Sequence, residues 1–121
     1  MTLARVVVEK NIRSVMEFKD IARRAIEIKN KYALQNEELG IKAWKVEDYY
    51  QGFVGDVGDL GKLIMARNNL RRYEDQDQKL AHELADCLWS ILIIAEELGV
   101  NLEEEFLKAK LSTLEKKNGH P

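Results

Sequence analysis

The stretch that decides the fold runs from Leu84 to Ala95 and reads LADCLWSILIIA. Ten of its twelve residues are apolar, and the two exceptions are Asp86 and Ser90. A carboxylate buried without a partner costs several kcal/mol, so Asp86 in this setting needs a cation, a proton or a strong hydrogen bond. Glu83 lies three residues upstream, which places both carboxylates on one side of a helix. We expect Asp86 to be the most deeply buried acid, and the functional hypothesis starts from this pair.

Length and composition predict a single domain over residues 1–121. The chain is 45% hydrophobic and 33% charged, with a net charge of −2. A chain of this length buries roughly two-thirds of its unfolded surface on folding. The charge balance lacks the basic excess of a general nucleic-acid binder, so we expect no stable nucleic-acid partner.

The absence of targeting signals in the sequence favours a cytoplasmic protein. The apolar core of MTLARVVVEK, at the start of the chain, is too short for a signal peptide. The longest apolar stretch falls well below the roughly 20 residues that span a bilayer, so we expect no membrane association. The single cysteine, Cys87, forms no intrachain disulfide, which favours a reducing compartment.

The spacing of apolar residues predicts an all-α fold. The only proline is Pro121, so nothing interrupts the helical segments. We expect helices at about 11–38, 46–66, 79–98 and 102–117. Gly40 and Gly99 are stop signals, and Asn101 is the N-cap of the last helix. Thr2–Val8 is compatible with either a short strand or the first turn of a helix. Four helices with short connections predict a bundle.

The third predicted helix is apolar on nearly every side. Trp89 and Ile93 lie almost opposite its main apolar stripe, which consists of Leu80, Leu84, Cys87, Leu88, Ile91, Ala95 and Leu98. A helix of this kind is a buried one, and a chain of four short helices has little material to bury it. We therefore expect a homo-oligomer, most simply a dimer, that completes the bundle and buries Trp89 or Ile93.

Two pairs of acidic residues carry the functional hypothesis. Asp56 and Asp59 repeat the spacing of Glu83 and Asp86, and they occupy the same flank of the apolar stripe of their helix. Four converging carboxylates repel one another unless cations intervene, and oxygen ligands suit Mg²⁺ or Mn²⁺. The alternative is that these are ordinary surface acids. This alternative applies more readily to Asp56 and Asp59 than to Glu83 and Asp86, which lie next to the apolar run.

Glycines recur every third residue around the first acidic pair, in the segment GFVGDVGDLG at 52–61. Each glycine inside a helix costs about 1 kcal/mol relative to alanine. The glycines leave room beside Asp56 and Asp59 for either a ligand or a closely packed helix. The segment matches neither a Walker A loop nor the GxGxxG dinucleotide turn.

Several other residues are candidates for ligand binding. Trp44 precedes the second helix and is suited either to stacking on a base or to capping the core. His82 lies four residues before Asp86, where it is a candidate supporting group or a plain surface residue. The candidate phosphate ligands, which are otherwise solvated charges, are Arg67, Arg71, Arg72, Lys108 and Lys110.

Two segments, GDVGDLGKL and HELADCLWSILIIAEELGVNLEEEF, resemble the MazG-like nucleoside triphosphate pyrophosphohydrolases of the all-α NTP pyrophosphatase superfamily. The resemblance covers about Trp44–Lys117. It implies that Asp56 and Asp59 stand at the ExxE glutamates of the family and that Glu83 and Asp86 match ExxD. These four acids would be the catalytic residues and would hold Mg²⁺. The resemblance also implies a dimer or tetramer that hydrolyses (d)NTPs to monophosphate and pyrophosphate, with Trp44 as the base-stacking aromatic.

The sequence departs from the family pattern at two places. The first motif reads DxxD, and aspartate is one methylene shorter than glutamate. Members of the family tend to carry a lysine and then an asparagine on the last helix, and the matching residues here are Ala109 and Thr113. The neighbouring Lys108 and Lys110 are therefore the candidate substrate ligands. A non-catalytic helical dimer that binds a nucleotide or a protein partner is the alternative function. A di-iron bundle is disfavoured, because it needs Glu-x-x-His on two helices and the corresponding residue here is Asp86.

Overall fold

The computed structural model describes residues 16–68 and 75–117. Within these ranges every regular element is helical, which confirms the all-α prediction. The elements are α2 (Phe18–Glu38), α3 (Val46–Asn68), α4 (Gln76–Glu97), α5 (Leu102–Glu105), the π-helical turn η1 (Phe106–Leu111) and α6 (Ser112–Lys116). The predictions for Thr2–Val8, for the start of the first helix at 11–15, and for Arg71 and Arg72 lie outside the described residues.

The helix ends that glycine and asparagine signals predict lie at the expected places, but two helix starts differ from the prediction. The α2 helix begins at Phe18 after the extended N-cap Glu17, so the prediction of helix at Met16 and Glu17 is wrong, and α4 begins at Gln76, three residues before the predicted start. Gly40 and Gly99 adopt φ values of 72° and 68°, a conformation that glycine reaches without strain. After each glycine the chain turns back to its helix: the Ile41 N–H donates to the Asn36 carbonyl, and the Val100 N–H donates to the Ala95 carbonyl. At the next helix start, the Asn101 side chain accepts a hydrogen bond from the Glu104 N–H at 3.1 Å.

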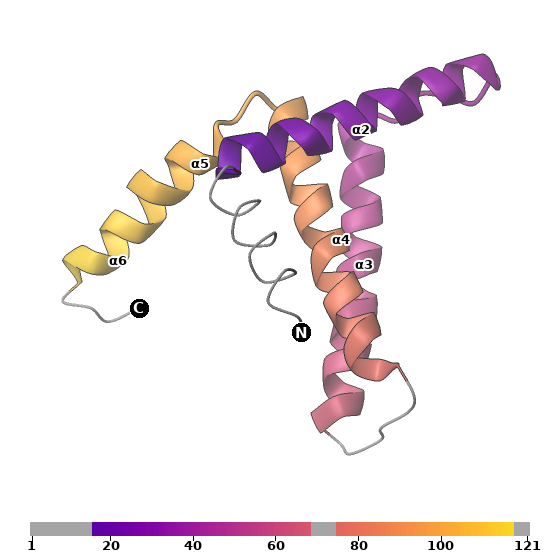
Figure 1. The fold of residues 1–121 in the computed structure, drawn as a ribbon. Coiled ribbons are helices and arrows are strands. Elements are labelled where there is room, and N and C mark those ends of the chain that lie inside the picture. The colour runs from indigo at the N-terminus through magenta and orange to yellow at the C-terminus, as the bar shows by residue number, and fades with distance from the viewer. Residues whose placement is uncertain (1–15, 69–74, 118–121) are drawn as a thin grey trace, which may run out of the picture.

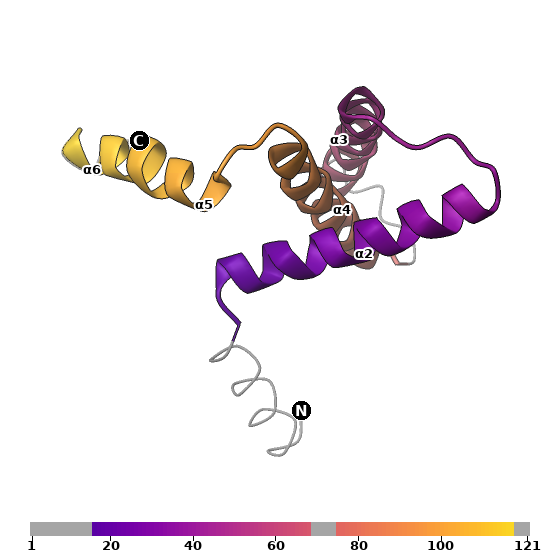
Figure 2. The ribbon, with the colours of Figure 1, turned by 90° about the horizontal axis from the view of Figure 1, so that it is seen from above.

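The helices α3 and α4 form an antiparallel hairpin, and α2 crosses it at a steep angle (Figure 1). Seen from above, α4 lies between α3 and α2 (Figure 2). The core is centred on Ala25 of α2 with Leu92 and Ile93 of α4, and the neighbouring apolar groups are Ala22, Ile26, Tyr49, Trp89 and Leu102. Within the described ranges no helix has the length and apolar character needed to cross a bilayer.

The burial of α4 differs from the prediction at Ile93 and along part of the main apolar stripe. Ile93 is completely buried against α2 of the same chain, and Trp89 packs against that same core. On the other side, Leu84, Leu88 and Ile91 are 54%, 47% and 38% exposed. The prediction that an oligomer partner buries Ile93 is therefore wrong. A helical wheel separates the two sides, but only the path of α2 decides which of them the chain covers.

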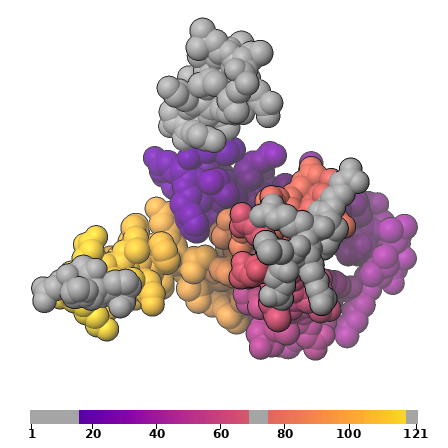
Figure 3. Space-filling view, turned by 90° about the horizontal axis from the view of Figure 1, so that it is seen from below, coloured from indigo at the N-terminus to yellow at the C-terminus, as the bar shows by residue number. Residues whose placement is uncertain are grey.

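The C-terminal segment is helical, as predicted, but it is not a regular α-helix. At Ser112 both the backbone N–H and the hydroxyl donate to the Leu107 carbonyl, five residues earlier, and so close a π-helical turn. The segment projects away from the hairpin and leaves Phe106 and Leu107 about half exposed (Figures 1 and 3). Within the described residues, the bundle-like packing therefore involves α2, α3 and α4.

Candidate functional site

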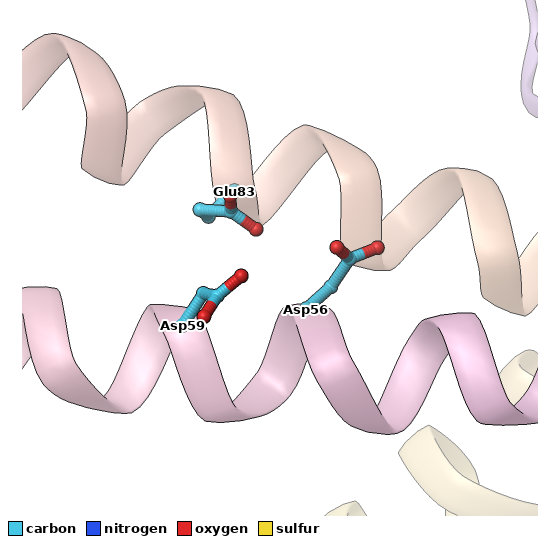
Figure 4. Close-up of side chains that lie close together, drawn as sticks. All are labelled: Asp56, Asp59 and Glu83. Carbon is cyan, nitrogen blue, oxygen red and sulfur yellow. The ribbon is translucent and has the colours of Figure 1, made fainter.

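The hairpin brings acidic side chains of α3 and α4 together. Asp56 and Asp59 lie one turn apart on α3, and Glu83 reaches toward them from α4 (Figure 4). One carboxylate oxygen of each residue lies within 4.8 Å of those of the other two. We call these three residues the acid cluster. The sequence prediction that the two helices share an acidic site is supported for these three residues.

One oxygen of the acid cluster is buried without a partner. Within the described part of the chain, Glu83 Oε2 is inaccessible to solvent and accepts no hydrogen bond. Asp56 is half-buried, whereas Asp59 is exposed. An unsatisfied buried acceptor costs about 1–3 kcal/mol, and more when it is charged. The cluster therefore contains an acceptor that is free to bind a donor or a cation.

The electrostatics of the acid cluster are unfavourable in the absence of a cation. Burial is the first cause that raises the pKa of Asp56, and the charges of Asp86 and Asp59 add to it. Burial and the carboxylate of Asp56 likewise raise the pKa of Glu83. The pKa of the buried Cys87 thiol is raised for the same reasons, so this thiol stays protonated and is a poor nucleophile. Within the described ranges no member of the cluster forms an ion pair.

Asp86 lies at the rim of the acid cluster. Its side chain is 39% exposed, and its Oδ2 lies 3.5 Å from Nε2 of His82. The prediction that Asp86 is the most deeply buried acid is therefore wrong. Its neighbours in the sequence are apolar, but Leu84 and Leu88 are themselves exposed and do not bury it. Asp86 still acts on the cluster through its charge, which raises the pKa of Asp56 and that of Glu83.

Trp44 lies beside α3, close to the acid cluster. Its ring packs edge-on against Tyr49, with centroids 5.2 Å apart, and remains half exposed. A Cβ built on Gly52 would lie 3.8 Å from the Trp44 ring. Gly52 precedes Asp56 by four residues, which is about 6 Å along one face of the helix. The structure therefore places an accessible aromatic face about one turn from the first acid.

The other glycines of α3 border open space. A Cβ added at Gly55, Gly58 or Gly61 would meet no atom within 4 Å, helix backbone aside. The alternative that these glycines admit a closely packed helix is therefore not realised within one chain. The room that they leave beside Asp56 and Asp59 is accessible.

The predicted phosphate ligands are not brought to the acid cluster within one chain. Lys108 belongs to η1, which lies on the segment that projects away from the hairpin (Figure 1). Its Nζ pairs with Glu104 Oε1 at 2.6 Å. Lys110 lies on the same segment, and Arg67 pairs with Asp77 at 3.6 Å. Sequence spacing predicts a helix for Lys108 and Lys110 but not the direction in which that helix leaves the core.

An ion pair between α2 and α4, which the sequence analysis did not predict, joins residues that are distant in the sequence. Lys29 Nζ of α2 lies 2.7 Å from Glu97 Oε1 of α4, with side chains that are 15% and 30% exposed. The pair fastens α2 to α4 next to Tyr49, whose pKa burial raises. The polar flank of α4 is the signal that could have indicated Glu97, but its partner depends on the crossing of α2.

Searches of family models, curated proteins and solved structures found no match to this chain. Its function is consequently inferred from the motif residues and from the geometry of the acid cluster.

Proposed function

We propose that the protein is a Mg²⁺-dependent, MazG-like nucleoside triphosphate pyrophosphohydrolase that converts a (d)NTP and water to a (d)NMP and pyrophosphate. One observation carries the proposal: carboxylate oxygens of Asp56, Asp59 and Glu83, from two helices, lie within 4.8 Å of one another. None of these acids forms an ion pair among the described residues, and one oxygen of Glu83 is buried without a hydrogen bond. A cation supplies what this arrangement lacks.

The donor set of the acid cluster fits a hard divalent ion. Mg²⁺ and Mn²⁺ prefer carboxylate oxygens and keep part of their water shell, which the exposed Asp59 side of the cluster permits. Asp56, Asp59 and Glu83 would hold the ion, and Asp86 would join them at the rim. When bound, such an ion neutralises the charge that develops on triphosphate oxygens during phosphoryl transfer.

The residues around the acid cluster have separate roles in this proposal. A carboxylate of the cluster orients a water molecule and accepts its proton as the water oxygen attacks the α-phosphorus. The bond from that phosphorus to the bridging oxygen breaks, and pyrophosphate leaves. Trp44, half exposed and about one turn from Asp56, offers a surface on which the base stacks.

The proposal includes a homo-oligomer in the cytoplasm, with neither a nucleic acid nor a membrane as a partner. Lys108 and Lys110 belong to the segment that projects away from the hairpin, so in this proposal they bind a triphosphate at the acid cluster of a second copy. Exposed apolar residues on α3 and α4 also favour assembly.

Pyrophosphate release measured over a panel of dNTPs and NTPs, with and without Mg²⁺, tests the proposed activity. We expect turnover only with Mg²⁺ or Mn²⁺, and pyrophosphate together with a monophosphate as the products. Release of single phosphates, or turnover unaffected by chelation of the metal, would contradict the proposal.

A non-catalytic nucleotide-binding or protein-binding dimer is the second candidate. The observation that favours it is the aspartate pair at Asp56 and Asp59, where the family resemblance implies longer glutamates. Mg²⁺-dependent binding of a nucleotide without turnover over the whole panel would select this candidate.

A further inference from the structure

The proposed function leaves His82, beside the acid cluster, without a role. His82 and Asp86 lie four residues apart on α4, so their side chains share one face of that helix. Nε2 of His82 lies 3.5 Å from Oδ2 of Asp86. Because one helix carries both residues, this proximity does not depend on how α2 or α3 packs against α4.

The carboxylate of Asp86 has one ion-pair partner in the described part of the chain, and that partner is His82. The nearby Leu84 and Leu88 are apolar and exposed, so they neither bury this carboxylate nor donate to it. A side chain at an open rim loses rotational freedom when it binds a cation. A donor that holds the carboxylate in place beforehand lowers this entropic cost.

The contact between His82 and Asp86 has the chemistry of a donor and an acceptor. Its length is about 0.3 Å beyond the usual upper limit for an N–H···O hydrogen bond. The His82 side chain is 76% exposed, so a small rotation brings Nε2 within range. An imidazole donates through Nε2 when it is protonated and also in one neutral tautomer, so the contact requires no change of protonation. Oδ2 of Asp86 accepts, which leaves Oδ1 for a cation or for a water molecule bound to it.

His82 also acts on the acid cluster through its charge. Burial is the first cause that raises the pKa of Asp56 and that of Glu83, and the charge of Asp86 raises both further. Among the described groups that act on these two carboxylates, His82 is the one that lowers their pKa values. His82 therefore lies close enough to offset part of the repulsion that Asp86 adds to the cluster.

We propose that His82 is a positioning residue, whose Nε2–H donates to Oδ2 of Asp86 and so orients the Asp86 carboxylate toward an ion held by the acid cluster. Donors behind the ligands of a metal keep those ligands in place, and their removal typically weakens metal binding about 10-fold to 100-fold. The pair is too exposed to contribute much to folding, so its effect falls on metal binding. This inference rests on the metal site of the proposed function and extends that site by one residue.

Binding of Mn²⁺ to the metal-free chain, titrated by electron paramagnetic resonance without nucleotide, tests this role. We expect His82→Leu, which removes the donor, to raise the dissociation constant for Mn²⁺ about tenfold. His82→Gln keeps an N–H donor close to the place of Nε2 and should restore the constant to within about threefold of the wild type. Gln78→Leu is the matched control, since Gln78 is also exposed and lies one turn earlier on α4, and it should leave the constant unchanged.

A double-mutant cycle with Asp86→Ala identifies the residue through which His82 acts. If His82 positions Asp86, His82→Leu should have no further effect on Mn²⁺ binding once residue 86 is alanine. A tenfold loss that persists in Asp86→Ala would overturn the inference, because His82 would then bind the ion directly. A loss in His82→Gln as large as that in His82→Leu would also overturn it.

The same titrations separate this inference from the proposed function. Circular dichroism and the Tm of each variant show that a change in Mn²⁺ binding is not a loss of fold. A wild-type chain that binds no Mn²⁺ would overturn the proposed metal site, and the role of His82 with it. A wild type and a His82→Leu variant that bind Mn²⁺ equally tightly would overturn the role of His82 alone and leave the metal site in place.

Discussion

Two glutamates of α4, about four helical turns apart on one side of the helix, meet opposite surroundings. Glu97 meets Lys29 of α2, with 2.7 Å between their charged atoms and side chains that are 30% and 15% exposed. Glu83 meets Asp56 and Asp59 of α3 instead, and one of its oxygens has no hydrogen bond among the described residues. One glutamate of α4 is thus paired with a cation, whereas the other is repelled by two carboxylates.

This difference separates a structural contact from a candidate functional one. At Glu97 opposite charges meet at a hydrogen-bond distance of 2.7 Å, so this carboxylate has a charged partner although it remains partly exposed to solvent. The contact at Glu83 keeps like charges together at a cost in free energy, and the packing of α3 on α4 maintains it. Positions where a folded protein retains an unfavourable contact, such as one between like charges, are often functional.

The largest expected effect comes from removing the charge of Glu83. We expect Glu83→Gln to lower kcat for Mg²⁺-dependent pyrophosphate release by about 100-fold to 1000-fold, since metal-stabilised charge is worth several kcal/mol in the transition state. Glu97→Gln, the same change on the same helix, should leave kcat within about threefold. Equal losses in the two variants would show that Glu83 acts only through folding.

The second expected effect concerns the ion pair between Lys29 and Glu97. We expect Lys29→Met to destabilise the fold by about 1 kcal/mol, because it leaves the partly exposed Glu97 carboxylate without its cation while solvent screens part of the loss. Lys108→Met is the control, since the Lys108–Glu104 pair is solvent-exposed and is worth at most about 0.5 kcal/mol. Thermal and urea unfolding followed by circular dichroism measure both variants. A control variant that loses as much stability as Lys29→Met would refute the distinction between the two pairs.

A smaller effect on kcat is expected for Asp86, at the rim of the acid cluster. Asp86→Asn should lower kcat by about tenfold, or about 1.4 kcal/mol, because Asp86 contributes charge to the cluster but lies outside the three converging oxygens. The comparison with Glu83→Gln in the same assay is decisive. A larger loss in Asp86→Asn than in Glu83→Gln would identify Asp86 as a principal metal ligand.

The smallest effect concerns stability without metal. Since the pKa values of Asp56 and Glu83 are raised in the folded state, folding takes up protons, and these groups destabilise the fold at neutral pH. The destabilisation fades as the pH falls through the raised pKa values toward the usual values of 3.8 and 4.5. Metal-free Glu83→Gln should therefore have a higher Tm than the wild type near pH 7, and this difference in Tm should be smaller near pH 4.

Added Mg²⁺ should reverse the order of the two proteins at neutral pH, because it stabilises the wild type more than Glu83→Gln. Differential scanning calorimetry at both pH values, with EDTA or Mg²⁺, measures the effect. A metal-free variant less stable than the wild type would mean that Glu83 is satisfied without a cation.

The fold was largely predictable because its signals are local. Gly40 and Gly99 mark helix ends through their backbone freedom, and Asn101 marks a helix start through its side-chain acceptor. The convergence of Asp56, Asp59 and Glu83 was also predictable, since equal spacing places acids on corresponding flanks of two adjacent helices.

The remaining features depend on contacts between residues that are distant in the sequence. A helical wheel shows that Ile93 and Leu88 face opposite ways, but only the crossing of α2 determines which one is buried. The apolar neighbours of Asp86 predict burial only if those neighbours are themselves covered. The directions of Lys108 and Lys110 depend on the path of the chain after Gly99, which spacing does not encode.

The π-helical turn at Phe106–Leu111 acts as a correction of helical phase. Such a turn accommodates one residue more than an α-helical turn, which rotates everything after it by about 100°. In an uninterrupted α-helix Leu114 would lie about 120° from Leu102. With the extra residue it returns to within about 20°, in line with Leu102 and Phe106. The turn thus has the form of a tolerated single-residue insertion, and deleting Ala109 should yield a regular α-helix that keeps the same apolar edge.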